Sequence, residues 1–261
     1  MTHEAHHASA DIINGILTML VCDVLTLRPE HGARLLARGL TDAEITRLRY
    51  VSSPVTRVER QRAADALASY LETFSGGVPG FYRDGHRWRM VFRPPGFFIP
   101  ARDEHGFIRA LAQRVDEPRG GGKYIWFSSA DRDGGASSGA PVHFANRPAL
   151  WHAEELLVTE GTLKADVIAA LSRLPVVGVA GVNNTRGLAA RLRSSFPRLR
   201  RVVVAFDSDA RTKPQVADAL ESLIAQLEAE RFRVRVRTWP GESKGLDDYL
   251  LSQSCAKEVA A

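Results

Sequence analysis

Carboxylates stand at the ends of two apolar segments that are far apart in the chain. The segment 156–160 ends on Glu160, and the segment 202–207 ends on Asp207, with Asp209 two residues later. Both apolar runs have the length and composition of buried strands, and a helical pattern follows each of them. In an open parallel α/β sheet the carboxyl ends of the strands form one edge, where ligands bind. We therefore expect Glu160, Asp207 and Asp209 to meet at that edge.

Three carboxylates at one edge repel one another unless a positive ion lies between them. Their oxygens are hard ligands that suit Mg²⁺ or Mn²⁺. The pattern therefore predicts a divalent metal site in which Glu160, Asp207 and Asp209 are both metal ligands and catalytic residues. The alternative interpretation is that Glu160 and Asp207 are helix N-terminal acids that complement the helix dipoles. That alternative accounts for one acid per helix and leaves Asp209 unexplained.

The C-terminal part of the chain alternates between strand and helix patterns. Strands are predicted over residues 156–160, 175–180, 202–207 and 232–238. Helices are predicted over residues 162–173, 185–195 and 214–230. Alternation of this kind predicts an α/β fold with a mostly parallel sheet and helices on both of its faces.

The upstream part has a different character. Residues 1 to about 75 have helical patterns, and the last of these helices is stopped by Gly76 and Gly77. Strands follow at residues 88–92, 96–102, 107–115 and 123–128, and residues 103–106 predict a hairpin turn between the middle two. The Gly- and Ser-rich residues 131–141 predict a loop or linker.

The charge of the chain is mildly basic and unevenly distributed. The 261 residues carry a formal net charge of +5, and 44% of them are hydrophobic, which is ordinary for a globular protein. Six arginines and no acid occur between Thr185 and Arg201. Such a block either binds phosphates of nucleic acid or forms a solvated arginine-rich helix face, and the sequence leaves both interpretations open.

Cysteine content and hydropathy exclude several classes. Only Cys22 and Cys255 are present, without a Cys-x-x-Cys pair, which argues against a structural zinc ribbon and a disulfide scaffold and fits a reducing cytoplasm. The apolar run 12–27 contains Asn14 and Asp23, so we expect a core helix there and neither a membrane span nor a secretory signal.

Three acidic motifs together resemble the Toprim domain. Glu160-Gly161 and Asp207-Ser208-Asp209 are separated by a strand–helix–strand pattern, as in that family. The segment Lys244 to Leu250 follows the last strand and resembles the acidic segment that closes the metal site of bacterial primases, with Asp247 at the matching acid. The resemblance therefore implies Asp247 as a further metal ligand.

The upstream half extends the resemblance to the bacterial-type primase catalytic core. Residues 97–103, 106–109 and 122–128 follow one another in the order of the small α+β subdomain that precedes Toprim in primases. Lys123 matches a lysine that faces the nucleotide and nucleic-acid cleft in that family. Two motifs of this chain are similar to signatures of primase-like proteins of plasmids, phages and integrated elements: Glu-Gly-x-Leu-Lys-Ala-Asp and Lys-Gly-Leu-Asp. The resemblance covers about residues 30–252. The chain departs from the family pattern at Lys164, where bacterial primases commonly carry an acid.

The resemblance implies a domain order: a helical region over 1–76, a mixed α/β primase-core subdomain over 77–150, a Rossmann-like Toprim domain over 151–252 and a tail over 253–261. It implies a primase that makes short primers for a mobile element by two-metal phosphoryl transfer with Mg²⁺ or Mn²⁺. The expected partners are single-stranded DNA, NTPs and a replicative helicase or other replication protein, with no membrane. The implied nucleotide- and nucleic-acid-binding residues are basic: Lys123, Arg102, Arg109, Arg114, Lys164 and Arg186.

Two other functions remain open on the sequence alone. A Toprim nuclease would use the same carboxylates and metals to hydrolyse a phosphodiester. A non-catalytic nucleic-acid-binding adaptor of the replication machinery would keep the fold without the reaction.

Overall fold

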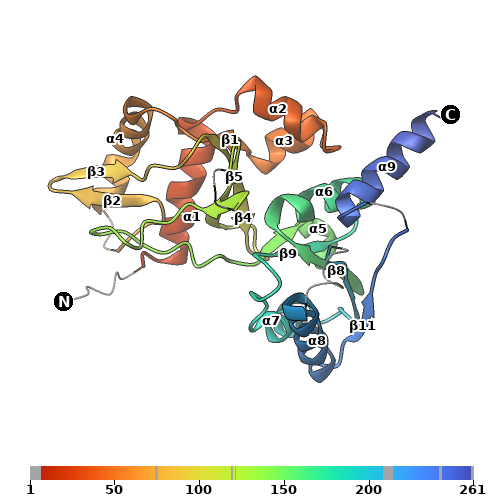
Figure 1. The fold of residues 1–261 in the computed structure, drawn as a ribbon. Helices are drawn as coiled ribbons and strands as arrows, with labels where there is room; N and C mark the ends of the chain where they lie inside the picture. Colours follow the sequence, from red (N-terminus) through yellow and green to blue (C-terminus); the bar gives the residue numbers. More distant parts are fainter. Residues whose placement is uncertain are drawn as a thin grey trace. The chain divides into compact units, whose positions relative to one another are not determined.

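A computed structural model of the chain describes residues 7–73, 76–118, 120, 122–207, 214–240 and 243–259 (Figure 1). The chain divides into two compact units. Unit 1 consists of Met1–Arg34, Asp42–Asp103 and Phe107–Pro141. Unit 2 consists of Leu35–Thr41, Glu104–Gly106 and Val142–Ala261.

Unit 1 is built on an antiparallel sheet. Its strands are β1 (Val51–Ser52), β4 (Gly96–Arg102), β5 (Ile108–Val115) and β6 (Tyr124–Trp126), in the order β1-β4-β5-β6. A separate hairpin joins β2 (Phe81–Asp84) to β3 (Arg87–Met90). The hairpin predicted between residues 96 and 115 is confirmed, because β4 and β5 pair antiparallel along their lengths.

Helices supply the core of unit 1. They are α1 (Ala10–Met19), which continues as a π-helical turn (Leu20–Val24), α2 (Pro29–Leu36), α3 (Asp42–Leu48) and α4 (Arg57–Thr73). Ile16 and Leu17 of α1 and Leu67 of α4 are buried in one cluster with Phe98 and Leu111 of the sheet. In the described part of the chain no single helix is long and apolar enough to cross a membrane, although the bent pair Ala10–Val24 and Pro29–Leu36 passes that test jointly by length and composition.

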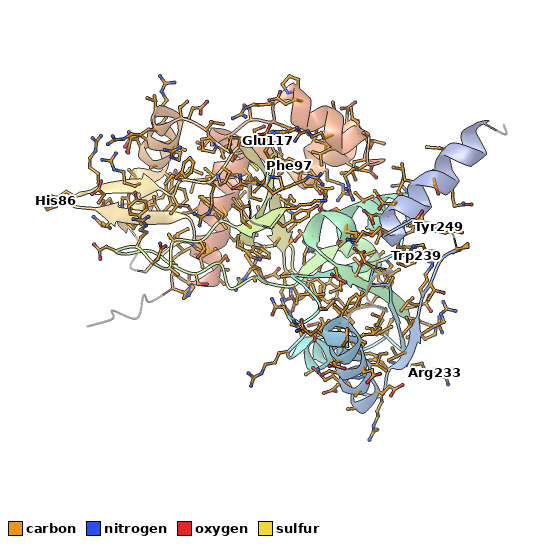
Figure 2. The ribbon with its side chains drawn as sticks, in the orientation of Figure 1. His86, Phe97, Glu117, Arg233, Trp239 and Tyr249 are labelled. Atoms are coloured by element: carbon orange, nitrogen blue, oxygen red, sulfur yellow. The ribbon has the colours of Figure 1, made fainter. Side chains whose placement is uncertain are left out.

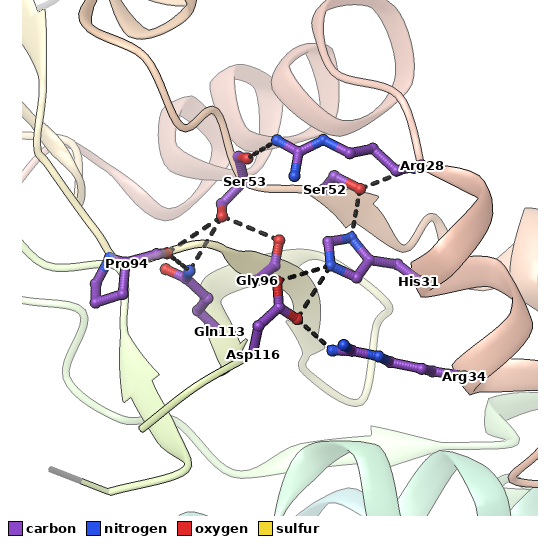
Figure 3. A network of polar contacts seen from close by, with 9 residues as sticks. All are labelled: Arg28, His31, Arg34, Ser52, Ser53, Pro94, Gly96, Gln113 and Asp116. Carbon is purple, nitrogen blue, oxygen red and sulfur yellow. Dashed lines mark hydrogen bonds and ion pairs between the residues drawn. The ribbon is translucent and has the colours of Figure 1, made fainter. Parts of the chain in front are cut away.

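A buried polar network ties α2 to the sheet of unit 1 (Figure 3). Ser52 Oγ lies 2.6 Å from His31 Nδ1 and accepts the Arg28 backbone N–H at 2.8 Å. His31 Nε2 lies 3.1 Å from Asp116, which also binds Arg34. A serine, a histidine and an aspartate that contact one another in this order can also form a catalytic triad. His31 is fully buried, however, and Ser52 is already hydrogen-bonded to the backbone, so the network is structural.

Unit 2 is built on a five-stranded sheet in the order β11-β10-β8-β9-β7. The strands are β7 (His143–Ala145), β8 (Glu155–Glu160), β9 (Val176–Val179), β10 (Arg201–Val204) and β11 (Arg233–Val236). All pairs are parallel except that between β7 and β9. The mixed α/β class and the mostly parallel sheet expected from the sequence are therefore confirmed.

Helices cover both faces of this sheet, as the alternating pattern predicts (Figure 1). They are α5 (Arg147–Leu150), α6 (Thr162–Ser172), α7 (Leu188–Ser195), α8 (Pro214–Ala229) and α9 (Leu246–Val259). Leu156 and Val158 of β8 belong to the cluster that contains α7 and α8. Leu157, between them, belongs to the opposite cluster with residues of α6 and α9. This alternation is the period of two of a strand buried on both faces.

Short strands are the part of the fold that the sequence pattern misses. Residues 1 to 75 are predicted as helical, yet Val51–Ser52 forms β1 and pairs with β4. His143–Ala145 forms the edge strand β7 without having been predicted. Elements of two or three residues are too short to show a period. The loop over 131–141 is confirmed, but it is not a free linker, because Ala136 is fully buried and its backbone pairs with Ser129.

Candidate active site at the carboxyl edge of the parallel sheet

Strand pairing brings Glu160 and Asp207 to the same edge of the unit 2 sheet. β8 and β10 are neighbours in parallel register, with Val158 opposite Val204. The Ala205 N–H donates to the Val158 carbonyl at 2.8 Å, so the pairing continues past the end of β10. Glu160 is the last residue of β8, and Asp207 follows β10 by three residues. Both side chains are partly exposed at this edge.

Glycine shapes the turn directly after Glu160. Gly161 has φ 81° and ψ 146°, a backbone conformation that side chains strongly disfavour, and it precedes the first residue of α6. Its N–H donates to the Val179 carbonyl of β9 at 2.7 Å. A Cβ on Gly178 of β9 would lie 2.7 Å from the Gly161 carbonyl oxygen. A side chain on Gly178 would therefore clash with this turn, whereas at Gly161 it is the backbone conformation that disfavours a side chain.

Asp247 joins the same cluster from the first turn of α9. Its side chain is 2% exposed, and Arg38 contacts Oδ2 while Oδ1 is buried without a hydrogen-bond partner. A Cβ on Gly245 would lie 2.3 Å from Asp247 Oδ1 and 3.3 Å from Asp207 Oδ1. Asp247 Oδ1 and Asp207 Oδ1 are therefore no farther apart than the sum of these two distances. The missing side chain at Gly245 thus leaves a small space that both carboxylates line.

Two basic side chains set the electrostatics of this cluster. Lys164, in the first turn of α6, contacts Asp207 Oδ1 through its Nζ. Burial raises the pKa of Asp247 above its ordinary value, while the charges of Lys164 and Arg38 act in the opposite direction. The contact places Lys164 within the acidic cluster, where the sequence alone predicted a contact with nucleotide.

Two carboxylate oxygens at this edge are of the kind that a hard divalent cation prefers. Asp247 Oδ1 is an orphaned buried acceptor beside Asp207 Oδ1, and carboxylate oxygens are the ligands that Mg²⁺ and Mn²⁺ prefer. Within the described residues, no group of three or more histidine, cysteine or acidic side chains is arranged to hold a metal ion. Asp209, the third ligand expected from the sequence, lies outside the described residues.

The neighbouring acid Asp166 has a different partner. It follows Lys164 by two residues and lies 3.0 Å from His143 Nε2 of β7, with both side chains almost fully buried. The pair ties α6 to the edge strand. Asp166 is therefore part of the support of the sheet.

Unit 1 carries four of the predicted basic binding residues. Arg102 donates to the Leu48 carbonyl at 3.3 Å, and Arg109 lies 3.9 Å from Asp103. Arg114 lies 6.0 Å from the centre of the Tyr124 ring. Lys123 is exposed directly before β6. Three of the four thus make contacts within unit 1.

The arginine block between residues 185 and 201 is largely structural. Arg191 contacts Glu104, and Arg193 donates to the Glu230 carbonyl at 2.8 Å and stacks 3.9 Å from the centre of a phenylalanine ring. Arg201 donates to Glu155 at 3.0 Å. Arg186 is exposed, in the turn that precedes α7. Three of the six arginines are thus held by partners within unit 2, which argues against both a continuous phosphate-binding surface and a simply solvated helix face.

Arg38 and Gly245 belong to this site but were not predicted from the sequence. Arg38 belongs to the short segment Leu35–Thr41 of unit 2, and it reaches Asp247 across 209 positions of sequence. Nothing in its surroundings in the sequence distinguishes it from the other arginines of the predicted helical region. Gly245 lies in the Lys-Gly-Leu-Asp motif that drew attention to Asp247, but its role as an open space between carboxylates emerges only in the structure.

Residues 151–257 match a family model described as "Domain of unknown function (DUF3854)". No curated protein matches the chain. Among solved structures, the zinc-binding and RNA polymerase domains of the Aquifex aeolicus primase align with 97% of this chain and 60% of that chain, at 17% identity and a TM-score of 0.69.

Two further structures agree. The RNA polymerase domain of Mycobacterium tuberculosis primase DnaG aligns with 96% of this chain and 84% of that chain, at 14% identity and a TM-score of 0.66. A DnaG primase catalytic domain bound to single-stranded DNA aligns with 96% and 77%, at 18% identity and a TM-score of 0.64.

The fold is similar to that of a DnaG-type primase catalytic core. The similarity extends over nearly the whole of this chain, so it includes both the antiparallel sheet of unit 1 and the mostly parallel sheet of unit 2. The chain spans about 60% of the Aquifex aeolicus primase fragment.

Proposed function

We propose that this chain is a DNA primase-like nucleotidyltransferase that synthesises short primers on single-stranded DNA for a mobile element. One observation carries the proposal: Glu160 ends β8 and Asp207 follows the neighbouring parallel strand β10, in a fold similar to primase catalytic cores. One of the solved structures with a similar fold is a DnaG primase catalytic domain bound to single-stranded DNA, which supports single-stranded DNA as the proposed template. The mobile-element role rests on the resemblance of the Glu-Gly and Lys-Gly-Leu-Asp motifs.

The proposal assigns roles to the parts of the chain. Residues 151–252 form a Toprim domain that carries the reaction, after a helical region over 1–76 and a primase-core subdomain over 77–150, and residues 253–261 form a tail. The cytoplasm, with its NTPs and replication proteins, is the proposed location. A replicative helicase or another replication protein is the proposed partner for template selection, as the resemblance to bacterial primases implies.

The acidic edge is the proposed reaction centre. Glu160, Asp207, Asp209 and Asp247 would hold Mg²⁺ or Mn²⁺, which stabilises the charge of the phosphoryl group and of the leaving pyrophosphate when bound. The two-metal mechanism expected from the sequence needs two positive centres about 3.5–4 Å apart. Arg38 orients Asp247 by binding Oδ2, so Oδ1 stays directed at the space beside Gly245. Lys123, Arg102, Arg109, Arg114 and Arg186 are the proposed contacts to triphosphate and template backbone.

Incorporation of labelled NTPs on defined single-stranded DNA templates tests this function. We expect primer synthesis by the wild type and its loss in Asp207→Asn, which keeps the size of the side chain and removes the charge. Asp218→Asn, on the exposed face of α8, makes the same charge change in the same unit and is expected to remain active. Unchanged primer synthesis by a folded Asp207→Asn variant would refute the assignment.

The same samples separate the two other functions. Hydrolysis of single- or double-stranded DNA without NTP incorporation would identify a metal-dependent nuclease built on the same residues. Nucleic-acid binding without either reaction and without Mn²⁺ binding would identify a non-catalytic adaptor.

A further inference from the structure

The contact between Lys164 and Asp207 puts a fixed positive charge inside the acidic cluster. Lys164 Nζ contacts Asp207 Oδ1, and its charge also acts on Asp247. Asp207 Oδ1 is one of the two oxygens that line the space beside Gly245. The ammonium group therefore lies next to the position where a cation would bind.

The start of α6 determines where this charge lies. Gly161 ends β8, and Lys164 is the third residue of the helix that follows. Its neighbours Leu163 and Ala165 are fully buried, whereas the Lys164 side chain is 19% exposed. Lys164 thus belongs to the same rigid strand–turn–helix unit as Glu160, and its position is tied to that of the proposed metal ligand.

Basic side chains already neutralise part of the acidic edge. Among the described residues, Asp207 contacts Lys164 and Asp247 contacts Arg38. Each of these two carboxylates therefore has a fixed positive charge beside it before any cation binds. A second divalent ion would add to this positive charge in a partly buried site, which is costly.

We propose that the Lys164 ammonium group takes the place of one of the two metal ions, so that the chain binds a single Mg²⁺ or Mn²⁺. This inference rests on the proposed function, and it deepens it by assigning the second positive centre to the protein. Lys164 is a positioning residue: it holds Asp207 and supplies a permanent positive charge. An acidic side chain at the same position would turn the place of the ammonium group into a second cation site.

Counting bound Mn²⁺ per chain tests the inference without relying on activity. Free Mn²⁺ is measured by electron paramagnetic resonance during titration of the full chain, with circular dichroism to confirm that each variant is folded. We expect one ion on the wild type and two on Lys164→Glu. Arg198→Glu changes the net charge equally, in the turn that precedes β10 at the other end of that strand, and is expected to bind one.

The outcomes separate this inference from the function on which it rests. Two ions on the wild type, or one ion on a folded Lys164→Glu variant, would overturn the role of Lys164 and leave metal-dependent catalysis intact. No bound ion on the wild type would overturn both. Should Lys164→Glu fail to fold, Lys164→Met decides: we expect one ion bound roughly tenfold more tightly than by the wild type, because a like charge has been removed beside it. Unchanged affinity would contradict the proposal.

Discussion

Replacing Gly161 by alanine should disturb the site through the backbone alone. Gly161 has φ 81° and ψ 146°, and a Cβ there would meet no atom within 4 Å. The substitution therefore adds no clash, and its cost is that of holding alanine in a conformation that is essentially restricted to glycine. That cost is about 1–3 kcal/mol. For a folding unit of this size it corresponds to a fall in Tm of roughly 3–9 °C.

The functional effect should exceed the loss of stability. If the turn relaxes toward a conformation that alanine tolerates, Glu160 moves away from Asp207, since it is the residue directly before the turn. We expect Gly161→Ala to lose most primer synthesis at temperatures where circular dichroism shows it fully folded. Misplacement of a catalytic group by about 1 Å can cost on the order of a hundredfold in rate.

A matched substitution separates the two effects. Gly187 lies in the same unit with φ 75° and has no atom within 4 Å of a built Cβ. Gly187→Ala should cost about 1–2 kcal/mol, because it forces a left-handed conformation on alanine, but it should retain activity when folded. The reasoning would be refuted if Gly161→Ala were as stable as the wild type, or if it were destabilised and still fully active.

Two further predictions concern the support of the site. His143→Ala should lower the free energy of unfolding in urea by about 3–5 kcal/mol, because it removes one member of a buried pair whose atoms lie 3.0 Å apart. Adding Asp166→Ala should restore part of that loss, and additive effects of the two changes would show that they are not coupled. For Glu104, burial raises the pKa, but the hydrogen bond and charge of Arg191 outweigh it and hold the pKa below the ordinary 4.5. A depressed pKa stabilises the fold above 4.5, and this contribution is lost as pH falls through the folded value. Glu104→Gln should therefore show a smaller loss of stability between pH 5 and pH 3 than the wild type; equal pH profiles would contradict the pairing.

Local sequence patterns predicted the parts of the site that lie on regular elements. The apolar runs before Glu160 and Asp207 are long enough to indicate buried strands, and the carboxyl ends of parallel strands necessarily share an edge. The alternation of strands and helices was sufficient to predict the mostly parallel sheet and helices on both of its faces. These features depend on periodicity and on the rules of chain connection, both of which can be read from sequence.

Features that depend on contacts between distant residues could not be predicted in this way. Arg38 binds Asp247 from a segment that the sequence assigns to a helical region of the other half of the chain. The edge strand β7 has only three residues and owes its position to pairing with β9. Arg191 belongs to a basic block that suggested phosphate binding, yet its guanidinium group contacts Glu104. In each case the partner, and not the local pattern, determines the role.

A crystal structure with Mn²⁺, located by its anomalous scattering, tests the central claim most directly. The claim is that carboxylates from the ends of β8 and β10 and from the start of α9 share a cation. We predict an anomalous peak about 2.1 Å from an oxygen of Asp207 and within reach of Glu160 and Asp247. Absence of a peak at this edge of the sheet at saturating Mn²⁺, with Lys164 and Arg38 still in contact with the aspartates, would contradict it.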